Sequence, residues 1–227
     1  MTASGSGRLS TGAAVGLLVT LLVVVNITRS AVVPSSWHFV LNMSVGLAVV
    51  GIGLLAAMNP TEMGTAPADL AAGLRWGGTV FALITVGVLV GGALGLLGDE
   101  RTQVSAASMA WRALVVIPIG TVVVEELAFR GVLQGLLDRL LTPTRTLAVG
   151  AILFGLWHVF PAWRGGAVQS DVADVGRAAA VAGTLVATTA AGVGFGWLRQ
   201  RSGSVVAPML AHLATNSVTF ALSWAFT

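Results

Sequence analysis

The residues that could do chemistry lie in three apolar segments of the sequence. They are Glu125, Glu126 and Arg130 in the first segment, His158 in the second, and His212 and Asn216 in the third. An ionised side chain at the centre of a bilayer costs about 2.5–3.5 kcal/mol on insertion, so charged and imidazole side chains in such segments are functional candidates. The other apolar segments carry very little charge.

The spacing within the first segment indicates which side chains can meet. Residues four apart stack on one face of a helix, so Glu126 can pair with Arg130, while Glu125 is rotated by about 100° and points elsewhere. We therefore expect Glu125 to be a free carboxylate without a partner in its own helix. A carboxylate beside an imidazole suits a general base, and His158 is the natural candidate for that imidazole.

His212 and Asn216 are also four apart and would share one face of a third helix. Together they would offer two hydrogen-bond donors, which is what a developing oxyanion requires. A structural interpretation competes with this one, because polar side chains also join membrane helices and Glu126 with Arg130 can form a buried ion pair. The occurrence of three polar groups with so little other charge favours chemistry, whereas Phe154 is expected only to pack.

The composition is that of an integral membrane protein. Of the 227 residues, 56% are hydrophobic and only 9% are charged, against roughly a quarter in a soluble domain. The net charge of +3 rests on Arg residues scattered between apolar segments, which argues against a nucleic-acid-binding patch. The absence of Cys and Tyr excludes disulfides, thiolate nucleophiles, Cys-ligated metals and phenolic acid–base chemistry.

Seven segments are apolar and long enough to cross a bilayer as helices, which takes about 20 residues. They are residues 11–31, 37–58, 76–97, 109–137, 147–160, 178–198 and 205–226, of which the fifth is short unless it begins near 144. We therefore expect an all-α transmembrane bundle of about seven spans. Residues 1–10 are expected to form a disordered tail, 11–108 the N-terminal helices with an interfacial elbow at 59–75, and 109–227 a catalytic core.

The distribution of Arg between alternate loops favours a cytoplasmic N-terminus. Six Arg residues fall on the N-terminal side and four on the opposite side: Arg8, Arg75, Arg139, Arg145, Arg199 and Arg201 against Arg29, Arg101, Arg164 and Arg177. The sequence looks bacterial, so we expect a bacterial plasma membrane. A cleaved signal peptide is disfavoured, because the first apolar run exceeds the usual length of 7–15 residues.

The three segments together resemble a known family. The patterns E-E-x-x-x-R, F-x-x-x-H and H-x-x-x-N occur in this order, and they resemble the CPBP family of intramembrane proteases. This family includes type II CAAX prenyl endopeptidases and bacteriocin-immunity (Abi) proteins. The resemblance covers about residues 109–226 and includes the stretch 201–208 before the third pattern.

The resemblance implies a helical fold that encloses a catalytic cavity and cuts a peptide bond near the membrane surface. Carried over by position, it implies the following roles: Glu125 and His158 activate the attacking water, His212 and Asn216 stabilise the tetrahedral oxyanion, and Glu126 and Arg130 orient the site. The implied substrate is a peptide or a lipidated protein, with membrane lipid as the surrounding partner. No nucleic-acid partner is expected.

No cofactor is expected, although the family has been described both as metalloproteases and as metal-independent glutamate proteases. The sequence has no H-E-x-x-H motif, so zinc is disfavoured; two His and a Glu from three helices could still bind it. Two other intramembrane protease classes fit poorly. A rhomboid-like Ser motif occurs only at 4–7, in the tail, and an aspartyl-type motif at 95–99 is displaced by one residue and lacks a partner.

The leading hypothesis is therefore an intramembrane endopeptidase that acts on a membrane-associated or lipid-modified polypeptide. One alternative is a proton-coupled transporter, since intramembrane Glu, His and Arg also form proton relays. A second alternative is a non-catalytic protein of the bacteriocin self-immunity type.

Overall fold

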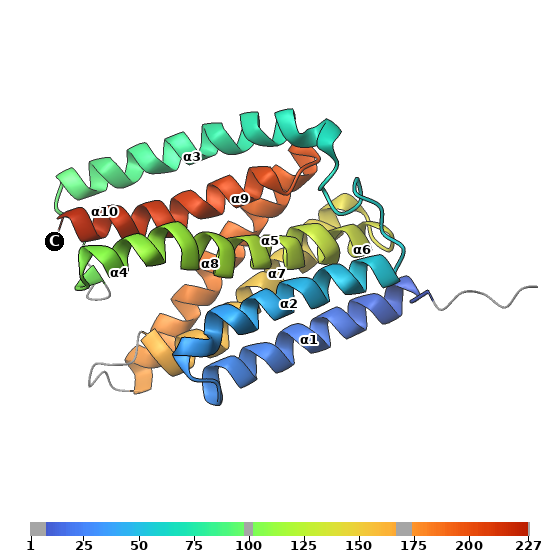
Figure 1. The fold of residues 1–227 in the computed structure, drawn as a ribbon, viewed down its shortest axis with the longest axis horizontal. Coiled ribbons are helices and arrows are strands. Elements are labelled where there is room, and N and C mark those ends of the chain that lie inside the picture. Colours follow the sequence, from blue (N-terminus) through green and yellow to red (C-terminus); the bar gives the residue numbers. More distant parts are fainter. Residues whose placement is uncertain (1–7, 98–101, 167–173, 227) are drawn as a thin grey trace, which may run out of the picture.

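The computed structural model describes residues 8–97, 102–166 and 174–226, and these ranges are helical without a strand. They form seven helical rods, so the predicted all-α bundle is confirmed. The fourth rod, residues 106–138, lies between α2 (His38–Leu55) and the rod formed by α9 (Val206–Leu213) and α10 (Thr219–Phe226), and α8 (Asp174–Ser202) runs obliquely to them (Figure 1). The motif at 4–7, Arg101 and the Asp residue at 99 lie outside the described residues.

The first three rods are α1 (Thr11–Ala31), α2 (His38–Leu55) and α3 (Leu70–Ala93). Short 3₁₀ turns, η1 (Ser35–Trp37) and η2 (Pro67–Asp69), lead into α2 and α3. The hydroxyl of Ser10 accepts a hydrogen bond from the Ala13 amide and so caps α1. The expected elbow is shorter than predicted, because residues 70–75 already belong to α3.

The fourth rod is a continuous helix that changes its winding several times. It consists of α4 (Ala106–Trp111), η4 (Arg112–Val116), η5 (Pro118–Val123), α5 (Val124–Glu126), η6 (Leu127–Leu133) and α6 (Gln134–Asp138), of which the three η segments are π-helical. Pro118 has no amide hydrogen, so it removes one backbone donor in the middle of the rod. Hydrophobic periodicity gives no sign of this winding.

The last three rods complete the bundle. They are α7 (Pro143–Pro161) with the π segment η7 (Ala162–Gly166), α8 (Asp174–Ser202), and α9 (Val206–Leu213) continued by the π segment η8 (Ala214–Val218) and by α10 (Thr219–Phe226). Pro143 occupies the first turn of α7, where its missing amide hydrogen costs nothing. Gly155 of α7 and Gly192 of α8 allow these two helices to approach closely.

Six helices are long and apolar enough to cross a membrane, and the seventh rod, residues 206–226, is not among them. This rod carries His212 and Asn216, which lower its hydropathy. Large apolar side chains are exposed on the outside of the bundle, for example Leu47, Leu83 and Val186 at 78%, 67% and 69%. Such a continuous apolar exterior is what a lipid environment covers.

The elbow that follows α2 is fixed to the end of the fourth rod. Asn59 and Glu62 cap each other reciprocally, since the amide of each donates to the side chain of the other. Arg139 donates to both carboxylate oxygens of Glu62, at 2.7 and 2.8 Å, and to the carbonyls of residues 56 and 57. These hydrogen bonds from the Arg139 guanidinium hold the pKa of Glu62 below its ordinary value.

Candidate active site

The two glutamates lie where the fourth rod changes its winding. Glu125 and Glu126 belong to the single α turn α5, and π-helical segments precede and follow it. Asn216 lies in another π-helical segment, η8, in the last rod. Isolated π segments within helices are rare and occur frequently at functional sites.

The predicted ion pair between Glu126 and Arg130 is present. Arg130 Nη1 donates to Glu126 Oε1 at 3.0 Å, and both side chains are buried. The same oxygen accepts a second hydrogen bond, at 2.8 Å, from Nδ1 of His212. Glu126 therefore connects the fourth rod to α9, a link that the spacing of the sequence did not predict.

Aromatic rings enclose the Arg130 guanidinium. Its central carbon lies 4.0 Å from the ring centroid of Phe154 and 5.1 Å from that of Phe195. Its Nη2 donates to the carbonyl of Gly192 in α8 at 3.4 Å. Phe154 is buried and packs as predicted, and it also provides the ring face that the buried cation requires.

Glu125 has no partner in its own helix, as expected, but it has one from α7. The indole Nε1 of Trp157 donates to Glu125 Oε1 at 3.2 Å. Its other oxygen, Oε2, is buried and has no hydrogen-bond partner among the described residues. Trp157 was not predicted as a site residue from the sequence. The signal that could have indicated it is its indole N–H donor, which lies directly before His158 in the sequence.

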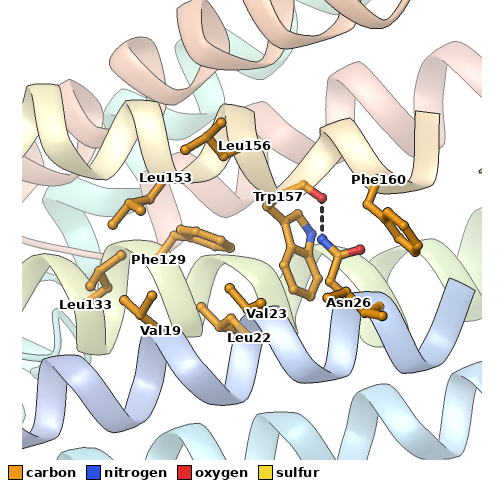
Figure 2. A pocket seen from close by; sticks show the side chains of 11 residues that line it. Val19, Leu22, Val23, Asn26, Phe129, Leu133, Leu153, Leu156, Trp157 and Phe160 are labelled. Carbon is orange, nitrogen blue, oxygen red and sulfur yellow. Dashed lines mark hydrogen bonds between the residues drawn. The ribbon is translucent and has the colours of Figure 1, made fainter. Parts of the chain in front are cut away.

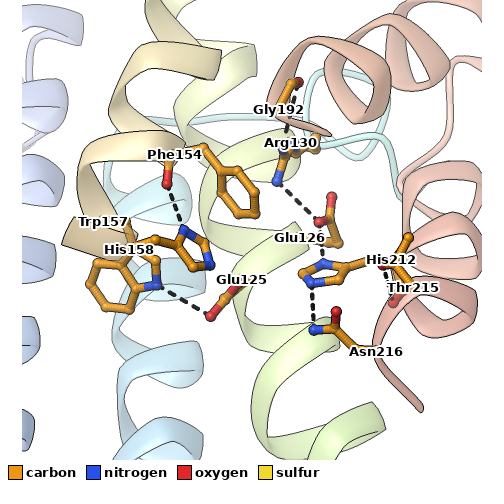
Figure 3. Close-up of polar contacts among 10 residues, drawn as sticks. All are labelled: Glu125, Glu126, Arg130, Phe154, Trp157, His158, Gly192, His212, Thr215 and Asn216. Carbon is orange, nitrogen blue, oxygen red and sulfur yellow. Dashed lines mark hydrogen bonds and ion pairs between the residues drawn. The ribbon is translucent and has the colours of Figure 1, made fainter. Parts of the chain in front are cut away.

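His158 is oriented by the carbonyl of Phe154, which lies one turn earlier in α7. The distance between Nδ1 and this oxygen is 2.8 Å, and a carbonyl can only accept, so Nδ1 carries a proton. In the neutral ring Nε2 then keeps its lone pair. No hydrogen bond or ion pair joins His158 to Glu125 within the described ranges, although Figure 3 shows the imidazole pointing toward this carboxylate.

His212 and Asn216 share one face, as predicted, but they also bond to each other. A carboxylate can only accept, so His212 Nδ1 donates to Glu126, and Asn216 Nδ2 donates to His212 Nε2 at 3.0 Å (Figure 3). In this arrangement His212 is neutral and presents no free donor. The remaining amide hydrogen of Asn216 is the donor that an oxyanion could meet.

The side chains do not fit a metal ion. In the parts of the chain that the structure describes, no three His, Asp or Glu side chains lie close enough together to hold one. Glu126 and His212 already satisfy each other, and Glu125 is bonded to an indole, which is not a metal ligand.

Two cavities share Leu22, Phe129 and Trp157 in their linings, and the smaller one reaches Glu125. The smaller cavity, of about 10 Å³, is lined by Glu125, Asn42 and Arg29 among others, and has room for about one water molecule. The larger is an apolar groove of about 260 Å³ between α1, η6 and α7 (Figure 2). A water-sized space and an apolar groove thus have the same two aromatic side chains in their linings.

Comparison with known proteins identifies the region that carries this site. A family model described as type II CAAX prenyl endopeptidase Rce1-like matches residues 106–218. Over these residues the chain belongs to the Rce1-like family. No curated protein and no solved structure matches the chain.

The Rce1-like region contains all six predicted site residues and the three π segments of the fourth rod. The members of this family are membrane endopeptidases of the CAAX type. The family match and the apolar helices together show that the chain is an integral membrane protein of this protease kind. The helices α1, α2 and α3 lie outside the Rce1-like match.

Proposed function

We propose that the chain is an intramembrane endopeptidase that hydrolyses a peptide bond of a membrane-associated or lipid-modified polypeptide with an activated water. One observation carries this proposal. Within the Rce1-like region, Glu125 Oε2 and His158 Nε2 come from different helices, and each lacks a hydrogen-bond partner among the described residues. These two atoms can accept a proton from water.

The first step is the addition of water to the substrate carbonyl. Glu125 and His158 hold the water, and one of them takes a proton as the oxygen attacks the carbonyl carbon. The carbonyl oxygen becomes an oxyanion, which accepts a hydrogen bond from the remaining amide hydrogen of Asn216, while the bond between Asn216 and His212 holds this amide in place. The water-sized cavity beside Glu125 supports this step.

The second step breaks the peptide bond. The oxyanion reforms a carbonyl, the carbon–nitrogen bond breaks, and the proton held by Glu125 or His158 passes to the leaving amine. Glu126 and Arg130 do not touch the substrate in this scheme. They hold His212 in place from the fourth rod, because Glu126 Oε1 bonds to both partners.

The apolar groove supports a substrate with a lipid chain or an apolar segment. Apart from Asn26 its lining is hydrophobic, and it shares Phe129 and Trp157 with the cavity at Glu125. We also propose that the protein lies in a bacterial plasma membrane with a cytoplasmic N-terminus, on the basis of the Arg distribution. The proposed reaction uses no cofactor.

The test compares Glu125→Gln with the wild type. The purified protein in liposomes is given a lipidated and an unlipidated peptide library, and products are identified by mass spectrometry of their termini. We expect Glu125→Gln to lower kcat by about 10²–10⁴-fold, because an amide cannot accept the proton. The matched control is Glu62→Gln, a carboxylate in the elbow that should leave cleavage per folded molecule unchanged.

Undiminished cleavage by Glu125→Gln would exclude it as the base. Proton flux in liposomes that depends on Glu125, without any cleavage, would favour the transporter hypothesis instead. Protection against a bacteriocin that survives loss of both Glu125 and His158 would favour the non-catalytic one.

A further inference from the structure

A proline near the end of α7 leaves one backbone carbonyl of this helix without its helical donor. Pro161 lies inside α7 and has no amide hydrogen, so the carbonyl of Trp157, four residues earlier, cannot form its usual helical hydrogen bond. The next amide, of Ala162, donates to the carbonyls of residues 158 and 159 instead. A buried carbonyl without a donor is costly in a membrane, where no water can replace the bond.

Asn26 of α1 supplies the missing donor. Its Nδ2 donates to the carbonyl of Trp157 (Figure 2). Asn26 is only 7% exposed, and the five residues that precede it in α1 are all apolar. The bond joins a helix outside the Rce1-like match to the turn of α7 that precedes Pro161.

This turn carries two side chains that face the glutamates. Trp157 donates its indole hydrogen to Glu125 Oε1, and His158 follows it directly. Because the Trp157 donor occupies Oε1, the oxygen left free is Oε2. The position of α7 at this turn therefore determines which oxygen of Glu125 can meet water.

We infer that Asn26 and Trp157 are positioning residues of the proposed protease. Asn26 fixes the turn of α7 that Pro161 interrupts, and the Trp157 indole in that turn fixes the Glu125 carboxylate. This inference rests on the proposed function, since it assigns these residues a role in the reaction of Glu125. It also gives α1, which the family match does not include, a part in building the site.

The experiment removes one hydrogen-bond donor from the Trp157 carbonyl and restores another by replacing Pro161. Asn26→Leu removes the donor to the Trp157 carbonyl, and Pro161→Ala restores a backbone amide hydrogen to the same carbonyl. We expect Asn26→Leu to lower kcat about 3- to 10-fold with KM unchanged, the effect of one hydrogen bond. The double variant Asn26→Leu/Pro161→Ala should regain the kcat of Pro161→Ala alone.

Trp157→Phe tests the second contact, because it keeps an aromatic ring but removes the indole hydrogen. We expect kcat to fall about 10- to 100-fold with KM unchanged, as for a hydrogen bond to a charged group. The matched controls are Thr28→Val, which removes a side-chain bond to a carbonyl within α1, and Trp197→Phe, outside the site. Neither control should change kcat.

A second measurement does not require activity. The indole ¹⁵N–¹H resonance of Trp157, identified by its loss in Trp157→Phe, should shift in Glu125→Gln and in Asn26→Leu. It should return in Asn26→Leu/Pro161→Ala and stay unchanged in Thr28→Val. These shifts test the contacts even where the wild type cleaves no peptide, an outcome that would overturn the proposed function alone.

The inference is overturned by an active wild type whose kcat is unaffected by both Asn26→Leu and Trp157→Phe. It is also overturned when Pro161→Ala fails to restore kcat and the resonance in the Asn26→Leu background. Where Asn26→Leu does not fold, Trp157→Phe decides, because it leaves α1 untouched.

Discussion

Replacing Arg130 with Met would remove the only guanidinium that contacts Glu126 among the described residues. Arg130 is 2% exposed and Glu126 is fully buried, so the substitution leaves a carboxylate in the bundle without its cation. Breaking a buried ion pair in this way costs about 3–5 kcal/mol. The lower end applies here, because His212 still donates a hydrogen bond to the same carboxylate oxygen.

The double variant Glu126→Gln/Arg130→Met removes both charges and should be less destabilised than the sum of the two single variants. The double variant still loses the contact between Arg130 and the Phe154 ring, about 0.5–2 kcal/mol, and the hydrogen bond from Arg130 to the Gly192 carbonyl. The free energy of coupling between the two positions should therefore be at least about 2 kcal/mol, within the range for residues in direct contact.

The assay is reversible unfolding in detergent micelles, followed by circular dichroism for the wild type, the two single variants and the double variant. Arg201→Met is a matched control, because Arg201 lies at the exposed end of α8. Additive effects, with a coupling below about 0.5 kcal/mol, would show that the pair does not hold the site together.

Two further predictions concern the elbow and the contact between α7 and α8. At neutral pH Glu62→Gln should lower the free energy of unfolding by roughly 0.5–1 kcal/mol, by removing the ion pair with Arg139. Because Arg139 lowers the pKa of Glu62 from 4.5, this difference should be complete above about pH 4.5 and vanish as the pH falls through the lowered pKa; a difference that is independent of pH would contradict it. Gly155→Ala should destabilise the fold by about 1–3 kcal/mol, because the added carbon collides with the Thr189 hydroxyl. Gly150→Ala meets no atom within 4 Å and should stabilise the fold by up to about 1 kcal/mol in the same unfolding assay, because alanine has the higher helix propensity. Equal effects of the two glycine variants would refute this account of the α7–α8 contact.

The sequence alone predicted which side chains share one face of a helix, although it did not predict that His212 and Asn216 would bond to each other. Glu126 with Arg130 and His212 with Asn216 are each four residues apart, and helical geometry brings such residues together whatever the rest of the chain does. The positions of the membrane-spanning helices could also be predicted, because an apolar segment must be long enough to cross the bilayer. Their ends were less so: α3 begins at Leu70 within the expected elbow, since hydropathy marks the membrane core and not the first helical residue.

Only the tertiary structure decided how the local pairs combine. The bonds from His212 to Glu126 and from Trp157 to Glu125 join residues 86 and 32 positions apart, and the bond from Asn26 joins residues 131 apart. Such contacts depend on which helices pack together and at what rotation, and the π winding on both sides of Glu125 changes that rotation without leaving a hydrophobic signature. Helical periodicity fixes the angle between neighbours on one rod, whereas the angle between rods is set by the packing of side chains from all of them.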